Sequence, residues 1–176
     1  AGELTLALAL EESHHHRPSH IATTVVAEGA GFVINGNKTF VLDGHSAEQL
    51  VVVARSSGEG RSTQGLTLLL VDRASAGLCC QRTVMADSRN AANLRFDQVR
   101  VGADRLIGEP GQGWAVLEPV LDRGRVALAL LRAADAVRAS SRRDRGRAQC
   151  VGPGVPRAGV PERPHATRAG RPRRRL

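Results

Sequence analysis

Hydrophobic and polar positions alternate at the start of the chain, and similar short patterns recur as far as about residue 101. Leu4, Leu6, Leu8 and Leu10 alternate with smaller or polar residues, which is typical of a β-strand. Further apolar or alternating runs, bounded by turn-forming residues, predict strands at 21–28, 32–36, 38–42, 50–55, 66–71, 78–85 and 92–101. No helical pattern alternates with them, so we expect a mainly β fold, an antiparallel barrel or sandwich of about eight strands.

Two of these patterns make more specific predictions. Asn35-Gly36-Asn37 separates the runs 32–36 and 38–42, and this residue combination indicates a tight hairpin turn. The runs 50–55 and 66–71 are apolar almost without interruption, which favours strands that are buried on both faces or line a closed barrel.

The apolar period changes beyond the segment 106–113. Large or small apolar residues then recur at steps of three and four, at Trp114, Leu117, Leu121, Gly124, Leu128 and Leu131. This spacing predicts one face of an amphipathic helix that runs to about Val137. Pro119 would kink the helix unless it lies in the first turn. A stripe this wide needs a helical bundle to pack against.

Charge is distributed unevenly along the 176 residues. The net charge is +8, but residues 1–133 hold 13 basic and 14 acidic side chains, whereas residues 134–176 hold 12 and 3. Large apolar residues are scarce after Ser140, so we expect this tail to be disordered. The predicted organisation is a β domain at 1–108, a helix at 109–138 and an Arg/Pro/Gly-rich tail at 139–176. We hypothesise that the tail is an out-of-frame reading of GC-rich DNA.

Several classes of protein are disfavoured by what the sequence lacks. It has no run of about 18 apolar residues, as a membrane-spanning helix requires, and no basic leader segment, so a cytoplasmic location is expected. Three cysteines make neither a disulfide framework nor a zinc site. The chain opens with Ala1 directly into a strand, from which we expect a fragment of a longer protein.

Three local clusters suggest chemistry, and each also has a simpler interpretation. His14-His15-His16, near His20, suits zinc or nickel, but consecutive residues do not easily converge on one ion, so a solvated loop is favoured and no metal site is assigned. Glu11-Glu12 could act as an acid/base pair, yet adjacent strand residues face opposite sides. Residues 108–113 could cradle phosphate, but they read more simply as a turn between domains.

Five segments resemble the acyl-CoA dehydrogenase family when they are taken together and in order. They are ALALEES (7–13), FVINGNKTFVLDGHSAEQLVVVAR (32–55), GLTLLLVDRASAGL (65–78), LRFDQVRVGADRLIGEPGQGWAVL (94–117) and LDRGRVALA (121–129). The resemblance covers roughly residues 3–137 and is nearest to pimeloyl-CoA dehydrogenase small subunits. It implies the family's middle β domain followed by the first helix of its C-terminal helical domain.

What the resemblance implies is FAD-dependent oxidation of an acyl-CoA to a 2-enoyl-CoA. Electrons would pass to an electron-transferring flavoprotein, and the complete protein would form a homo- or hetero-oligomer. The family's glutamate base is expected beyond residue 140, where Glu162 is the only glutamate and has no resembling surroundings. We therefore assign no catalytic residue and predict that this truncated chain is inactive.

The resemblance also implies site residues at matching positions. The cofactor-binding residues would be Leu10, Glu11, Glu12, Arg17, Phe40 and Leu42. Asp122 and Arg125 would lie near the substrate. Ser13 replaces the family's proline, His14 to Pro18 replace its Gly-Ser-Asp loop, and Leu42 replaces a hydroxyl residue. Arg17 nevertheless offers a cation to a phosphate.

Two alternatives from other classes stay open at this point. One is a non-catalytic binding module whose Arg-rich tail binds nucleic acid. An aromatic content of 2% leaves few side chains for base stacking, so nucleic acid is disfavoured as a partner. The other is a small metal-binding β-barrel enzyme that uses the His cluster.

Overall fold

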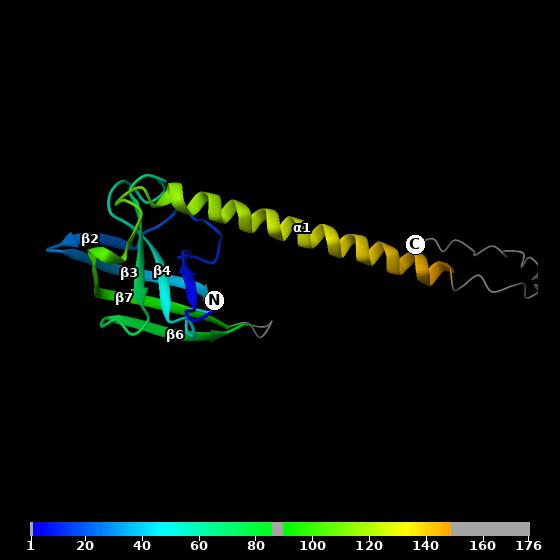
Figure 1. Cartoon of the computed structure of the whole chain (residues 1–176), viewed down its shortest axis with the longest axis horizontal. Helices are drawn as coiled ribbons and strands as arrows, with labels where there is room; N and C mark the ends of the chain where they lie inside the picture. Colours follow the sequence, from blue (N-terminus) through cyan, green and yellow to red (C-terminus); the bar gives the residue numbers. More distant parts are fainter. Residues whose placement is uncertain (1, 86–89, 149–176) are drawn as a thin grey trace, which may run out of the picture. The chain divides into compact units, whose positions relative to one another are not determined.

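A computed structural model describes residues 2–85 and 90–148 of the chain (Figure 1). Two compact units are distinguished, Ala1–Leu128 and Ala129–Leu176. The described strands are β1 (Leu6–Ala9), β2 (Thr24–Glu28), β3 (Gly31–Leu42), β4 (Gln49–Arg55), β5 (Leu66–Asp72), β6 (Leu78–Val84), β7 (Asn90–Gly102) and β8 (Leu106–Ile107). A short 3-10 helix, η1 (Ala103–Arg105), precedes β8, and the helix α1 spans Gly113–Ala148.

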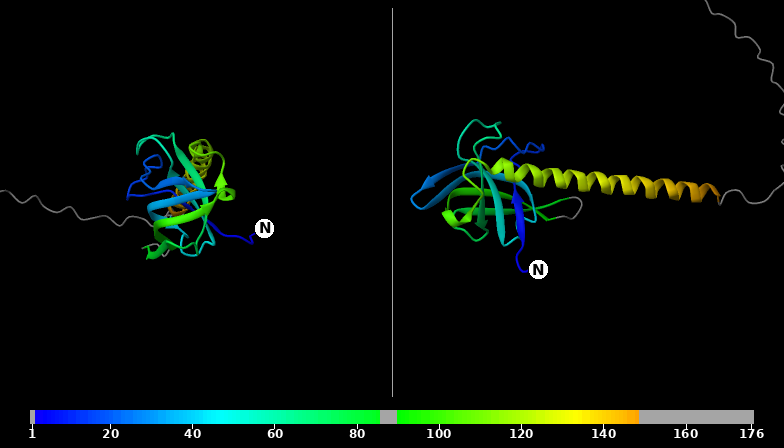
Figure 2. Two further views of the ribbon diagram at one scale, coloured as in Figure 1. Left: turned by 90° about the vertical axis from the view of Figure 1, so that its left-hand side faces the viewer. Right: turned by 45° about the horizontal axis from the view of Figure 1, so that its top comes forward.

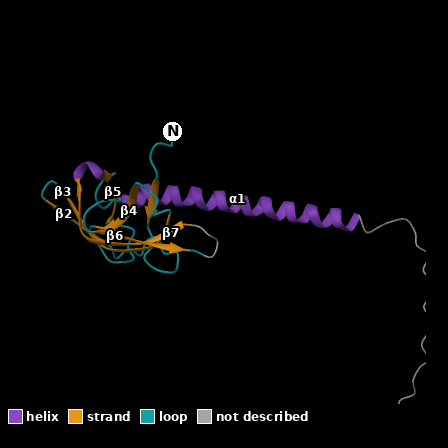
Figure 3. Cartoon of the chain, turned by 90° about the horizontal axis from the view of Figure 1, so that it is seen from below, coloured by secondary structure: helices purple, strands orange, loops and turns teal. Residues whose placement is uncertain are grey.

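The strands form one mostly antiparallel sheet in the order β6-β7-β3-β2-β4-β5-β8, with β1 paired to β4. Two further views show the strands crossing one another within the β unit (Figure 2). The parallel pairings are those of β1 and β2 with β4. The sheet curls without closing, and Figure 3 shows its strands, in orange, gathered in one β unit. The prediction of a mainly β, barrel- or sandwich-like fold followed by a long helix is therefore confirmed.

The predicted hairpin turn at Asn35-Gly36-Asn37 is wrong. β2 and β3 pair from Glu28 opposite Gly31, so the turn lies at 29–30, and residues 31–42 form one strand. Gly36 instead lies at an irregularity in the register between β3 and β7. Its φ is +145°, and a Cβ there would approach the Thr23 Cα to 2.6 Å. The glycine is needed for this close chain crossing rather than for a turn.

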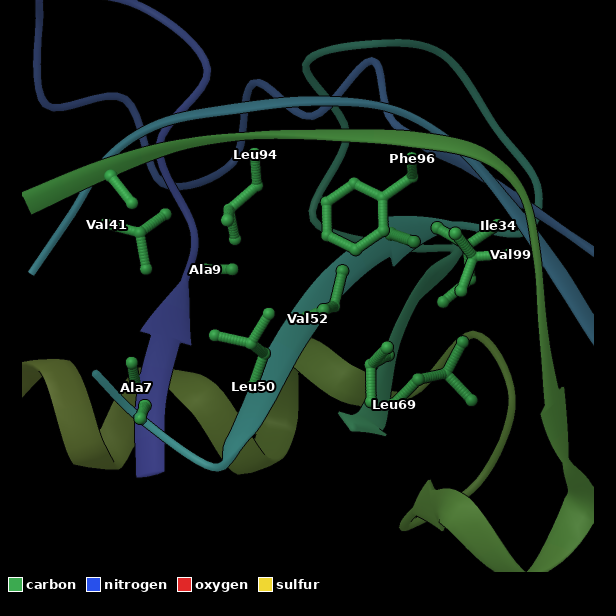
Figure 4. Packing of buried hydrophobic residues seen from close by; sticks show 14 of the residues in the cluster. Ala7, Ala9, Ile34, Val41, Leu50, Val52, Leu69, Leu94, Phe96 and Val99 are labelled. Atoms are coloured by element: carbon green, nitrogen blue, oxygen red, sulfur yellow. The ribbon is translucent and has the colours of Figure 1, made fainter. Parts of the chain in front are cut away.

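Two apolar clusters lie on either side of β4 and β5, as their uninterrupted apolar sequence predicts. The main core gathers residues from β1, β3, β4, β5 and β7, whose side chains point toward one another in Figure 4. A second cluster comprises Leu10, Ile21, Val53, Leu66, Leu68 and Leu117. In β1 the alanines Ala7 and Ala9 face the main core, whereas Leu6 and Leu8 are 54% and 37% exposed.

The helix α1 begins on the second cluster and runs further than predicted. Leu117 is buried there, with Trp114 and Leu121 packed against it, and the helix continues through Pro119 in its second turn. It ends at Ala148 rather than near residue 138, so the prediction of disorder is wrong for residues 139–148. The rest of the predicted tail, from residue 149, lies outside the described residues.

Within residues 2–85 and 90–148, no helix combines the length and the apolar character that spanning a bilayer requires.

Candidate functional site

Lys38, the only lysine of the chain, is fully buried at the centre of the candidate site. Its Nζ donates a hydrogen bond of 3.0 Å to the Leu10 carbonyl and one of 2.7 Å to Glu12 Oε1. Burial lowers the pKa of Lys38 to about 8, although the charge of Glu12 opposes this shift. The ammonium therefore links β3 to the segment that leaves β1.

The Glu12 carboxylate connects a third segment to this pair. Its Oε1 also accepts a 2.9 Å hydrogen bond from the Thr23 amide, and its Oε2 accepts one of 2.6 Å from the Ala22 amide. Burial acts to raise the pKa of Glu12, but Lys38 and the hydrogen bonds from residues 22 and 23 bring it below the ordinary value. Glu12 is thus held as a carboxylate where three segments meet.

Arg55, at the end of β4, is a second cation with little exposure to solvent. Its guanidinium donates to the carbonyls of Ser19 and Ile21 on one side. On the other side it donates to carbonyls of the 56–65 loop, those of Ser57, Ser62 and Gln64. Burial lowers the pKa of Arg55, and the charge of Glu12 opposes that effect. This side chain ties two loops to the end of one strand.

Glu11 points the other way and organises the histidine loop. One carboxylate oxygen lies 2.5 Å from His16 Nδ1, and the other accepts a 3.1 Å hydrogen bond from the Arg17 amide. The Glu11 carbonyl in turn accepts a hydrogen bond from the Thr39 amide of β3. The two adjacent glutamates thus face different partners, as their positions predict.

Phe40 presents an aromatic ring beside this loop. Its φ of +51° is left-handed, at a point where the register between β3 and β7 shifts, and its amide donates to Asn93 Oδ1. The ring is 40% exposed and lies 5.7 Å from that of His14, between centroids. Leu42 is 51% exposed on the same strand. Apolar surface is therefore available beside polar backbone and charged side chains.

The structure separates the six predicted cofactor residues into two groups. Arg17, Phe40 and Leu42 are exposed, and the Glu11 carboxylate stands beside the Arg17 amide. Leu10 and Glu12 are turned inward: the Leu10 side chain packs in the second cluster, and the Glu12 carboxylate is occupied by Lys38 and by the amides of residues 22 and 23.

Sequence reasoning missed Lys38 and Arg55 as organisers of the site. A signal for Lys38 was present, because a single lysine among 25 basic residues marks an unusual position. Arg55 follows an apolar strand, and nothing in that pattern shows that its guanidinium folds back between two loops.

The two predicted substrate residues lie on one exposed side of α1. Arg125 Nη1 donates a 2.6 Å hydrogen bond to Asp122 Oδ1, and both side chains are more than half exposed. Their spacing of three residues brings them onto neighbouring turns of the helix.

Two surface hollows border the elements described above. One is an apolar groove of about 310 Å³ whose lining includes Leu6, Leu8, Val116 and Val120. The other is lined by Arg17, Ser19, His20 and Arg61. Over the described part of the chain, no three His, Cys, Asp or Glu side chains gather where they could hold one metal ion.

Comparison with known proteins gives this geometry a context. The family model for the acyl-CoA dehydrogenase middle domain matches residues 7–99, just over half of the chain. The chain belongs to the acyl-CoA dehydrogenase family. The matched range contains every predicted cofactor residue, together with Lys38 and Arg55. It excludes Asp122 and Arg125, and the domain boundary predicted at 108 stays a prediction.

Individual relatives agree with this assignment. The mitochondrial short-chain specific acyl-CoA dehydrogenase of Rattus norvegicus is 32% identical over 61% of this chain and 27% of its own length. An acyl-CoA dehydrogenase structure from Geobacillus kaustophilus matches with a TM-score of 0.66 and 31% identity, over 73% of this chain and 35% of that one.

A structure of the electron transferring flavoprotein of Acidaminococcus fermentans also matches. Its TM-score is 0.65 at 25% identity, over 73% of this chain and 34% of that chain. The chain spans about a third, or less, of the length of each of these proteins.

Proposed function

We propose that this chain is the flavin-facing β domain of an FAD-dependent acyl-CoA dehydrogenase that converts an acyl-CoA to a 2-enoyl-CoA. The observation that carries the proposal is the exposed edge formed by Phe40 and Leu42, next to the loop organised by Glu11. This edge belongs to the segment that matches the family's middle domain.

The side chains around this edge fit the two chemically different ends of FAD. Phe40 and Leu42 offer apolar contact to a flat ring system, and His14 extends that surface. Arg17 offers a cation suited to a pyrophosphate, and its amide is already fixed by Glu11. When it is bound, FAD supplies the hydride acceptor for oxidation of the substrate.

The roles of Asp122 and Arg125 belong to the same proposal. The pair would contact the polar part of the acyl-CoA, with the Arg125 guanidinium as the group that attracts its phosphates. Because Asp122 already holds Arg125 Nη1, the guanidinium is orientated before a ligand arrives.

We also propose that the 176-residue chain alone does not turn over acyl-CoA. No residue in the described ranges is assigned the role of the base that removes the α proton, and Glu162 lies outside those ranges. An electron-transferring flavoprotein as acceptor, an oligomeric complete protein and a cytoplasmic location stay predictions. The alternative nucleic-acid role rests on a tail that, from residue 149, is also outside the described residues.

The proposal is tested by titrating the purified chain with FAD and following the quenching of flavin fluorescence. We expect saturable binding that Phe40→Ala weakens by about tenfold, because it removes aromatic contact area. Val84→Ala is the matched control, since Val84 is a 76% exposed apolar residue at the end of β6. Failure of the wild-type chain to bind FAD would overturn the cofactor part of the proposal.

Catalysis is tested separately with a panel of acyl-CoAs and an artificial dye as electron acceptor. We expect no FAD-dependent dye reduction above the blank for this chain. Measurable turnover would overturn the proposed inactivity, and it would require a base among the residues of this chain.

A further inference from the structure

The segment 10–23, which joins β1 to β2, is anchored near both ends by buried cations. At its start, Lys38 Nζ holds the Leu10 carbonyl and Glu12 Oε1. At its end, Arg55 holds the carbonyls of Ser19 and Ile21. Between these anchors the chain carries residues that the proposed function places beside the flavin. The conformation of the segment therefore depends on side chains that lie outside it.

Lys38 acts on both ends of this segment through one carboxylate. Glu12, which Lys38 holds at 2.7 Å, also accepts the amide hydrogens of Ala22 and Thr23, where the segment joins β2. Removing the ammonium would leave the Glu12 carboxylate, only 13% exposed, without its cation. An uncompensated charge of this kind moves toward solvent, and the two amide hydrogen bonds would be lost with it.

The exposed part of the segment is connected to the same strand as Lys38. The Thr39 amide donates to the Glu11 carbonyl, and Thr39 Oγ1 donates to the Ser13 carbonyl. Glu11 then fixes the Arg17 amide. The position of Arg17 relative to Phe40 is therefore set by consecutive residues of β3, of which Lys38 is the one with a buried charge.

We propose that Lys38 is a positioning residue for the flavin-facing segment 10–23: through Glu12 and the Leu10 carbonyl, its ammonium fixes where the chain that carries Glu11, His14 and Arg17 stands relative to Phe40. This inference rests on the proposed function for the identity of the ligand. Lys38 itself is fully buried, so it acts through these neighbours and does not contact the cofactor.

The first test is amide hydrogen exchange in the full chain. In Lys38→Met we expect the amides of Ala22 and Thr23 to exchange at least about tenfold faster, while the core amide of Val52 keeps its protection. Arg100→Met is the matched control, because Arg100 pairs at 3.0 Å with Glu28 on the surface. Unchanged exchange at residues 22 and 23 in a folded Lys38→Met chain would overturn the proposal.

The second test restores the charge chemically. Lys38→Cys is alkylated in denaturant with 2-bromoethylamine, which forms a lysine analogue, or with iodoacetamide, which adds a neutral cap, and each sample is then refolded. Wild type treated in parallel controls for the other three cysteines. We expect protection at residues 22 and 23, and FAD affinity, to recover with the ammonium and not with the amide. Equal recovery with both caps would show that shape rather than charge matters and would overturn the proposal.

These readouts also separate the two proposals. Loss of protection in Lys38→Met together with weaker FAD binding supports both. If wild type binds no FAD, the proposed cofactor fails, whereas the exchange data still decide the positioning role. If Lys38→Met does not fold, Glu12→Gln is measured in its place, since it keeps the size of the side chain and removes the charge that Lys38 holds.

Discussion

Single buried charges control the loops of this β domain. The Lys38 ammonium donates hydrogen bonds to one carboxylate and one carbonyl. The Arg55 guanidinium donates to carbonyls alone. Charges in such positions stabilise a particular loop arrangement only while every partner is present. Substitutions at these residues are therefore expected to act at a distance from the side chain that is changed.

Glu12 should make the chain sensitive to acid. Because its pKa is lower in the folded chain than its ordinary value of 4.5, its stabilising contribution is full above pH 4.5 and is lost as pH falls below that value. We expect Glu12→Gln to lower the unfolding free energy at pH 7 by about 3 kcal/mol, in the range for a broken buried pair. Urea unfolding at pH 7 and at pH 3.5 measures both effects.

The control for that experiment is Glu28→Gln, which removes the partner of an exposed arginine. It should change the unfolding free energy at pH 7 by less than about 1 kcal/mol. A wild-type chain that loses no more stability than Glu12→Gln between pH 7 and pH 3.5 would contradict the prediction.

Arg55→Lys should destabilise the chain almost as much as Arg55→Met, by about 3 kcal/mol. Lysine has three donors from one nitrogen, whereas the guanidinium of Arg55 reaches five carbonyls in two loops. Thermal and urea unfolding measure the loss, with Arg95→Lys as an exposed control. If Arg55→Lys kept the unfolding free energy of the wild type, the positive charge alone would be needed, and not the several hydrogen-bond donors of the guanidinium.

At the scale of elements, the strand β3 is continuous because a glycine lets another segment cross it. Thr23 passes so close to Gly36 that a Cβ would lie within 2.6 Å of its Cα. At Gly29, which has a φ of +59° in the true hairpin turn, a Cβ would have no neighbour within 4 Å. The two glycines thus serve different purposes, and the difference can be measured.

Gly36→Ala should cost about 3 kcal/mol of unfolding free energy, since it adds a backbone clash to an unfavourable φ. Gly29→Ala should cost only about 1 kcal/mol, because there the backbone conformation alone is strained. Urea unfolding of the two variants side by side provides the comparison. Equal costs would indicate that Gly36 lies in an open turn after all.

The elements that the sequence predicted best are those whose burial is uniform along the strand. β4 and β5 are apolar on both faces, and each face packs on a different cluster. Alternation in β1 located the strand, but its large residues face outward and its alanines face the main core. Periodicity finds a strand without saying which face is buried.

The candidate site could be predicted only in part, for a related reason. Resemblance to a family named Glu11, Arg17 and Phe40 as cofactor residues, and that role stays a prediction. Hydrogen bonds from Thr39 to the carbonyls of Glu11 and Ser13 hold β3 beside the segment 11–13. The hydrogen bonds of Lys38 span 26 and 28 positions, and those from Arg55 to Ile21 and Ser19 span 34 and 36, and no local pattern carries such information. Asn35-Gly36 led to a wrong hairpin prediction because the turn preference of this pair is a local property. The close approach of Thr23 to Gly36 is a contact between distant residues, which the local pattern does not show.

At the scale of the whole molecule, the β unit leaves an apolar groove uncovered. Leu6 and Leu8 of β1 and Val116 and Val120 of α1 line it, and all four side chains are exposed. Contiguous apolar surface of this kind is uncommon on monomeric proteins that need no partner. The chain itself spans about a third, or less, of the length of its relatives.

The groove should make the isolated chain self-associate at micromolar concentration and bind hydrophobic dyes. We expect the double substitution Leu8→Gln and Val120→Gln to reduce both effects severalfold without lowering the unfolding free energy by more than about 1 kcal/mol, because both side chains are already 37% and 54% exposed. Sedimentation velocity and dye fluorescence measure the two effects. Val84→Gln, on a more exposed valine outside the groove, should change neither effect. An equal effect from Val84→Gln would mean that general surface hydrophobicity, rather than the groove, drives association.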